Sequence, residues 1–161
     1  MSSSERHKLE MKIPEAESSS AIVFEKCSKG KRWFLVDGGG DKICSSRLFP
    51  SIISARRDIF LSYTMMAVAT RNLYENLERD VTIEVEEEKT GAFQWRLQSS
   101  GETLLCSGNT FTNTKGAIYD ALRTNVELTI LTNRIMQDSL QKNPATHARR
   151  RSQKRPHISS R

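Results

Sequence analysis

KRWFLV at residues 31–36 and FQWRLQ at residues 93–98 are the two stretches of sequence from which the fold can be predicted. In both, Trp and Leu alternate with other side chains, which is typical of a β-strand that buries one of its faces. The two tryptophans are 62 residues apart, and so are the two leucines. Similarity at one fixed spacing predicts an internal repeat.

The same 62-residue shift matches residues over most of the chain without a gap. Cys44-Ser45 then matches Cys106-Ser107, and we expect the two cysteines to be equivalent, buried and structural rather than reactive. The other matched pairs are Val23 and Val85, Glu25 and Glu87, Gly39 and Gly101, Phe49 and Phe111, Ala55 and Ala117, Asp58 and Asp120, and Thr70 and Thr132. These pairs predict that one structural unit has been copied in tandem.

Each copy is predicted to contain three strands followed by a long helix. The first strand is expected at residues 21–27 and again at 81–87, where apolar and polar residues alternate. The helix of the first copy should begin near Ser51 and bury a stripe of residues at seven-residue spacing, namely Ile52, Ile59, Met66 and Leu73. The second helix should run from Asn113 or Thr114, either of which could cap it, to about Lys142.

Neither three strands nor one amphipathic helix can bury its apolar face alone. We therefore predict an α+β fold, with two tandem βββα repeats that form antiparallel sheet packed on two long helices. Residues 21–79 would be the first repeat and residues 80–142 the second. Residues 1–20 are predicted to be a flexible N-terminal segment, and residues 143–161 a disordered Arg-rich tail, since both are too polar to form a core.

The second copy resembles a known family. The residues that carry the resemblance to the repeat of the YegP-like family are Phe93 to Leu97, Gly101 to Leu105, Ser107, Phe111-Thr112 and Ala117, and the first copy keeps Trp33, Leu35, Gly39, Ser45 and Phe49. This resemblance implies tandem βββα units and a family of small bacterial and archaeal proteins without a settled function. The order of elements is also similar to that of Whirly-type and PUR-type single-stranded nucleic-acid binders.

The charge of the chain, +6 overall, is unevenly distributed. Residues 142–161 carry seven Lys and Arg and no acid, while residues 21–79 carry ten bases and six acids. Residues 80–141 carry five bases and nine acids, so the two copies have opposite net charge. A basic tail on a polarised body predicts a polyanionic partner, and we expect single-stranded DNA or RNA.

The candidate nucleic-acid-binding residues lie in the first copy and in the tail. Phe34 is expected on the sheet face opposite Trp33, among cations, where an aromatic ring could stack with an unpaired base. The alternative is that Phe34 packs against the other copy or a second subunit. The full set is Lys29, Lys31, Arg32, Phe34, Arg56 and Arg57, together with Arg149, Arg150, Arg151, Lys154 and Arg155.

Catalysis is not expected. The three histidines, His7, His147 and His157, lie outside residues 21–141, so that region lacks a Ser-His or Cys-His pair and the usual zinc ligands. The spacing of the cysteines and acids predicts no metal site, and no motif implies a cofactor. Three cysteines and the lack of a signal peptide or apolar span favour an intracellular protein, cytoplasmic or nuclear, with no membrane partner.

A second interpretation makes the protein an interaction or assembly module. The apolar helical stripes and the oppositely charged copies would then be contact surfaces of a homo-oligomer, and the basic tail a nuclear-localisation signal. An accessory protein of a virus or mobile element that combines both properties is compatible with this sequence.

Overall fold

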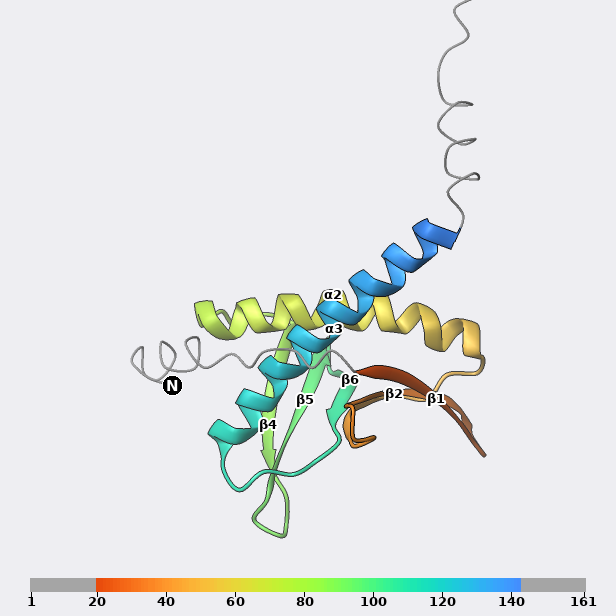
Figure 1. The fold of residues 1–161 in the computed structure, drawn as a ribbon. Helices are drawn as coiled ribbons and strands as arrows, with labels where there is room; N and C mark the ends of the chain where they lie inside the picture. The colour runs from red at the N-terminus through yellow and green to blue at the C-terminus, as the bar shows by residue number, and fades with distance from the viewer. Residues whose placement is uncertain (1–19, 143–161) are drawn as a thin grey trace, which may run out of the picture.

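The computed structural model describes residues 20–142, which form six strands and two helices (Figure 1). Each half of the chain runs βββα, and the observed architecture confirms the predicted α+β fold. The elements of the first half are β1 (Ala21–Cys27), β2 (Gly30–Val36), β3 (Lys42–Ser46) and α2 (Ile52–Glu75). Those of the second half are β4 (Val81–Glu87), β5 (Phe93–Ser99), β6 (Glu102–Ser107) and α3 (Thr114–Lys142).

All six strands belong to one antiparallel sheet with the order β1-β2-β3-β6-β5-β4. Strands β3 and β6 are neighbours at its centre, so the pairing of Ser45 with Cys106 joins the two halves. Both helices contribute to one buried cluster on one face of this sheet (Figure 1). The other face carries no helix within residues 20–142, and this face is called the open face below.

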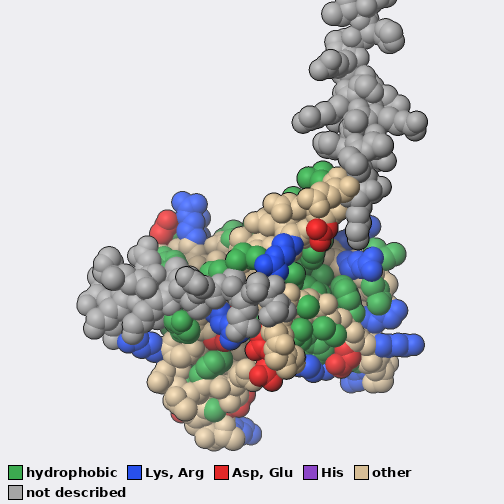
Figure 2. Space-filling model, in the orientation of Figure 1, with side chains coloured by type: hydrophobic (Ala, Val, Ile, Leu, Met, Phe, Trp, Pro, Cys, Tyr) green, Lys and Arg blue, Asp and Glu red, His purple; other side chains and the backbone are tan. Residues whose placement is uncertain are grey.

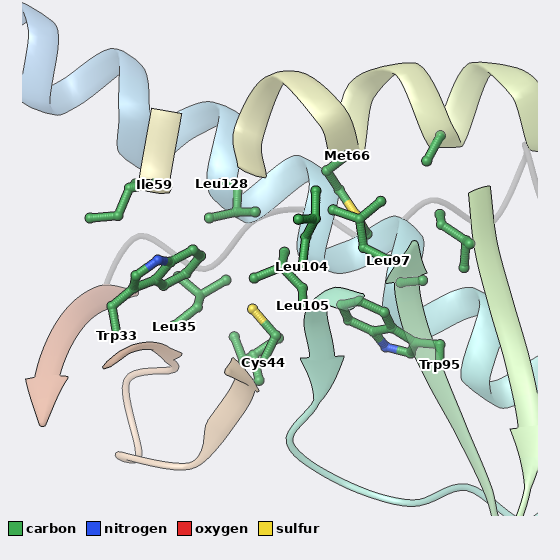
Figure 3. Close-up of a cluster of buried hydrophobic side chains, with 14 of the residues drawn as sticks. Trp33, Leu35, Cys44, Ile59, Met66, Trp95, Leu97, Leu104, Leu105 and Leu128 are labelled. Atoms are coloured by element: carbon green, nitrogen blue, oxygen red, sulfur yellow. The ribbon is translucent and has the colours of Figure 1, made fainter. Parts of the chain in front are cut away.

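Two tryptophans anchor the core at corresponding places. Trp33 and Trp95 are fully buried and lie on either side of Cys44, Leu104 and Leu105 (Figure 3). The indole N–H of Trp33 donates to Asp58 Oδ2 at 3.0 Å, and that of Trp95 donates to Asp120 Oδ2 at 2.8 Å. In each half, therefore, one hydrogen bond ties the second strand to the helix that covers it.

The alignment of the two halves without a gap is wrong in their first and third strands. Leu35 pairs with Cys44, whereas its counterpart Leu97 pairs with Leu105, so the third strands match at a spacing of 61 rather than 62 residues. The backbone N–H groups of the two tryptophans show the same offset, because they donate to Ser46 Oγ and Ser107 Oγ. The first strands are offset in the same way, since Phe24 faces Trp33 and Val85 faces Trp95. Between paired residues, the connection from the first to the second strand is one residue longer in the second half, and the connection from the second to the third strand is one residue shorter. The second strands therefore keep the 62-residue spacing.

This offset separates the two cysteines. Cys44 is fully buried in the core, and burial raises the pKa of its thiol. Cys106 pairs with Arg96 on the open face and is only partly buried. The expectation that these cysteines are equivalent is therefore wrong, because a single residue of register moves a side chain to the other face of a sheet.

The helices begin where the sequence predicts. Ser51 caps α2 in a reciprocal capping box with Ser54, and the Asn113 side chain accepts from the N–H of Gly116 at the start of α3. Of the predicted stripe on α2, Ile59 and Met66 lie in the core, but Ile52 is exposed because it stands in the first turn, before the helix crosses the sheet.

Replacement of the cap is expected to have a moderate effect. The change Ser51→Ala removes the acceptor for the Ser54 N–H and should lower the free energy of unfolding by about 1 kcal/mol. Urea denaturation of the two proteins measures the difference. Thr64→Ala, an exposed change within the same helix, is the control, and an equal effect of both changes would contradict the assigned cap.

Two arginines connect the halves. Arg47 forms ion pairs with Asp58 of its own half and with Glu102 of the other half. Arg123 lies 3.9 Å from Asp120 of its own half and 3.8 Å from Asp37 in the turn after β2. Each arginine thus joins the acid that holds a tryptophan to the hairpin between the second and third strands of the opposite half.

Candidate nucleic-acid interface

The open face of the first half carries a stack of cations over an aromatic ring. Phe34 lies on this face because Trp33 and Leu35, its neighbours in β2, both point into the core. The Arg32 guanidinium lies 4.8 Å from the centre of the Phe34 ring, and Lys42 Nζ lies 3.9 Å from it. The ring is only 3% exposed, so the two cations, and not the ring, form the accessible surface.

An acid partly neutralises this stack. Glu25, on the neighbouring strand β1, accepts a hydrogen bond from Arg32 at 3.1 Å and lies 3.8 Å from Lys42 Nζ. The hydrogen bonds from Arg32 and from the Cys27 thiol hold the pKa of the Glu25 carboxyl below its ordinary value. At neutral pH the four groups Glu25, Arg32, Phe34 and Lys42, named the Phe34 cluster here, therefore carry one net positive charge.

The open face of the second half differs in chemistry. Arg96 occupies the position that corresponds to Phe34, and it pairs with Glu86 at 2.8 Å. Its neighbours on this face are polar or acidic, including Glu84, opposite it on β4, and Cys106, opposite it on β6. Among the described residues of the open face, cations over an aromatic ring are therefore found at Phe34 and not at the corresponding Arg96.

The predicted site residues do not form one patch. Arg32 and Phe34 lie on the open face, whereas Arg56 lies on the helical side, where its guanidinium is 5.9 Å from the centre of the Phe24 ring. Lys31, which pairs with Lys26, lies two residues before Trp33 in β2. Because side chains alternate along a strand, Lys31 is on the same side of the sheet as Trp33, the helical side. Lys29 is exposed in the turn between β1 and β2, and Arg57 is exposed on α2. The tail residues Arg149, Arg150, Arg151, Lys154 and Arg155 lie outside the described residues.

Two members of the Phe34 cluster were not predicted. Lys42 begins β3 and Glu25 lies in β1, and neither adjoins Phe34 in the sequence. Hairpin pairing brings them together, because Val36 faces Lys42 and Arg32 faces Glu25 across neighbouring strands. The alternation of residues along these strands indicated the shared face, but the distance between the side chains depends on register.

The structure also reveals two buried acids whose roles the sequence did not indicate. Asp58 and Asp120 are 3% and 8% exposed, and burial raises the pKa of both carboxyls despite the hydrogen bonds from the tryptophans and the nearby arginines. Each accepts the indole hydrogen bond through Oδ2, and each has an arginine within 4 Å of Oδ1. Residues 20–142 contain no cluster of His, Cys, Asp or Glu able to hold a metal ion. Within the same range, no helix combines the length and apolar character needed to cross a bilayer.

Comparison with known proteins gives a fold but no activity. The structure is similar to the solution NMR structure of YegP from E. coli, a protein of unknown function, with a TM-score of 0.53 and 18% sequence identity. The similarity covers 69% of this chain and 87% of that one. This supports a YegP-like fold. The chain matches no protein-family model and none of the curated proteins.

Proposed function

We propose that this protein binds single-stranded DNA or RNA without catalysing a reaction, and that the Phe34 cluster is the contact for unpaired bases. The observation that supports the proposal is the guanidinium of Arg32 held over Phe34 on a sheet face that no described helix covers. Proteins that bind single strands use aromatic rings and flat arginine groups in this way, because every base has a face that can stack.

The burial of Phe34 changes the role proposed for it. With the ring beneath Arg32 and Lys42, a base would stack on the guanidinium plane of Arg32, and Phe34 would hold that plane in place. Lys42 and the exposed Lys29 would contact phosphates, and the basic residues at 149–155 would add sequence-independent affinity. Arg56 and Arg57, on the helical side, are not required for this mode of binding.

Neutralisation of Arg32 tests the site. We expect Arg32→Gln to weaken binding to labelled oligothymidylate or oligouridylate about tenfold, because it removes both the stacking plane and a charge. Arg96→Gln, the same change on the open face of the second half, is the matched control and should leave affinity nearly unchanged. Fluorescence anisotropy measures both, and equal affinities of the two variants would contradict the assigned site.

The role of the basic tail needs a separate test. If residues 149–155 contact phosphates, removal of residues 143–161 should reduce the dependence of affinity on salt concentration. If they serve only as a nuclear-localisation signal, the truncated protein should bind as well as the full chain and show the same salt dependence. Absence of binding by the full chain at low salt would overturn the nucleic-acid proposal itself.

A tandem origin of the two halves is part of the same proposal. The matched Trp-Asp hydrogen bonds, and the matched backbone pairings of Lys31 with Phe49 and of Phe93 with Phe111, support duplication of one βββα unit. After such a duplication, one open face could acquire cations and an aromatic ring while the other became acidic. The likeness of layout to Whirly-type and PUR-type binders agrees with this division but is an analogy of fold alone.

A further inference from the structure

An apolar groove lies on the helical side of the first half, between β1, the first half of α2 and the second half of α3. Its volume is ≈ 480 Å³, and its lining includes Ile22, Phe24, Phe60, Leu131 and Ile135. One charged side chain, Arg56, also lines it. A second hollow adjoins it and shares Phe60 and Ile135, and it continues along α3 to Met136 and Leu140.

The second half contains a counterpart hollow of ≈ 350 Å³, whose lining includes Ile83, Val85 and Ile118. There, Ile118 occupies the position of Arg56 and is 6% exposed, and Leu122 occupies the position of Phe60 and is 2% exposed. Leu73 and Tyr74, at the end of α2, pack over these two residues. In the first half Phe60 remains 42% exposed. The hollow of the second half therefore lacks the charged side chain and the exposed aromatic ring of the groove in the first half.

The two helices also differ in length. α3 has 29 residues and α2 has 24, and the last turns of α3 project beyond the sheet (Figure 1). Met136 and Leu140, on these turns, are 53% and 56% exposed. Figure 2 shows hydrophobic side chains both at this projecting end and over the body beside it. A projecting apolar segment and an open apolar groove thus lie next to each other on one surface.

The charges beside these apolar residues are opposite in sign. Arg56 lines the groove and forms no ion pair with another described residue. Asp138, on the projecting end of α3, forms none with a described residue either. In the described part of the chain, each molecule therefore has a cation without an ion-pair partner in the groove and an acid without one on the projecting helix. The acid of one molecule can pair with the cation of a second molecule.

We propose that this surface binds a second copy of the chain, forming a two-fold symmetric dimer. The projecting end of α3 from each copy would lie against the groove of the other, with Met136 and Leu140 in contact with Phe60 and Ile135 of the partner subunit. Asp138 would then approach Arg56 of the partner subunit. A two-fold interface uses the same patch twice, so a patch that carries both the groove and the projection can be satisfied on both sides at once.

Light scattering after gel filtration, without nucleic acid, tests the dimer over a range of protein concentrations. The full chain should elute with the mass of two copies. The double change Met136→Glu and Leu140→Glu should raise the dissociation constant at least tenfold. Leu77→Glu, an apolar-to-acidic change at the counterpart hollow of the second half, should leave the dimer intact.

Charge reversal tests the orientation of the two copies. Arg56→Glu alone and Asp138→Lys alone should each weaken the dimer about tenfold, and the two changes together should restore it. Arg57→Glu, on the neighbouring exposed residue of α2, is the control and should have no effect. A dimer that none of these charge changes weakens would overturn the proposed interface.

Two further results would overturn the proposal. The first is a wild-type protein that is a monomer at every concentration. The second is a monomeric protein whose melting temperature is lowered by Met136→Glu. That result would mean that a segment of the same chain already covers the groove. Neither result depends on nucleic acid, so failure of the dimer and failure of the nucleic-acid proposal are distinguishable.

Discussion

Trp95→Ala is expected to lower the free energy of unfolding by about 3–5 kcal/mol, and Trp33→Ala by a similar amount. Both side chains are fully buried, so truncation to alanine removes a large apolar contact area and leaves a cavity beneath the helices. Each change also removes the hydrogen bond that ties a strand to its helix. Chemical denaturation followed by circular dichroism measures the loss.

Two further variants serve as comparisons: one keeps most of the ring volume without the hydrogen bond, and the other is an exposed control. Trp95→Phe keeps most of the ring volume but cannot donate to Asp120, so we expect a smaller loss of about 1–3 kcal/mol. Val68→Ala, an exposed change on α2, should alter the free energy of unfolding by no more than about 0.5 kcal/mol. A loss below about 1 kcal/mol for either tryptophan-to-alanine change would show that the core does not depend on that residue.

The second large effect is expected at Asp58 and Asp120, as a difference in the free energy of unfolding between the Asn and the Ala variant of each residue. Asn keeps a side-chain oxygen that can accept from the indole N–H, whereas Ala leaves that buried N–H without an acceptor. We therefore expect Asp120→Ala to be less stable than Asp120→Asn by about 1–3 kcal/mol, and the same order at Asp58. Equal stabilities of the Ala and Asn variants would contradict the structural role assigned to these hydrogen bonds.

The pH dependence of stability has a definite sign at these two sites. Burial raises the pKa of both carboxyls in the folded protein, so the folded state holds these protons more tightly than the unfolded chain does. The resulting stabilisation is complete below the ordinary pKa of 3.8 and is lost as the pH rises through the raised value.

Replacement by Asn should remove this pH dependence, because an amide does not titrate. Relative to the wild type, Asp58→Asn and Asp120→Asn should therefore become more stable as the pH rises from about 4 to 7. Urea denaturation at several pH values measures the difference, with Asp41→Asn, an exposed acid in the turn before β3, as the control. A constant difference across this range would show that the two carboxyls titrate normally.

The local structure could be predicted well because it depends on neighbours in the sequence. The boundaries of β1 and β4, the cap at Ser51 and the extent of α3 each follow from alternation, capping residues or apolar spacing within a short segment. The burial of both tryptophans followed from the same alternation. The prediction that Cys44 and Cys106 are equivalent was wrong because the connection between the second and third strands differs by one residue between the halves. Only the strand pairing shows which face of the sheet each cysteine occupies.

The candidate site was predictable in part. Alternation placed Arg32 and Phe34 on the face opposite Trp33, and the structure has them there. It could not show that Lys42 and Glu25 complete the cluster, that Arg56 lies on the other side of the sheet, or that cations cover the ring of Phe34. Those relations join strands and helices distant in the chain.

The sequence by itself determined that this protein has two βββα halves, each with a buried tryptophan and a long helix, and that the first half is the more basic. Those properties follow from the periodicity and composition of short segments. Only the tertiary structure decided that the halves share one sheet through β3 and β6, that each tryptophan donates a hydrogen bond to an aspartate 25 residues away, and that the apolar groove of the first half lies beside the projecting end of α3. These depend on strand register and on the direction in which a helix leaves the sheet, which arise from the packing of the whole chain.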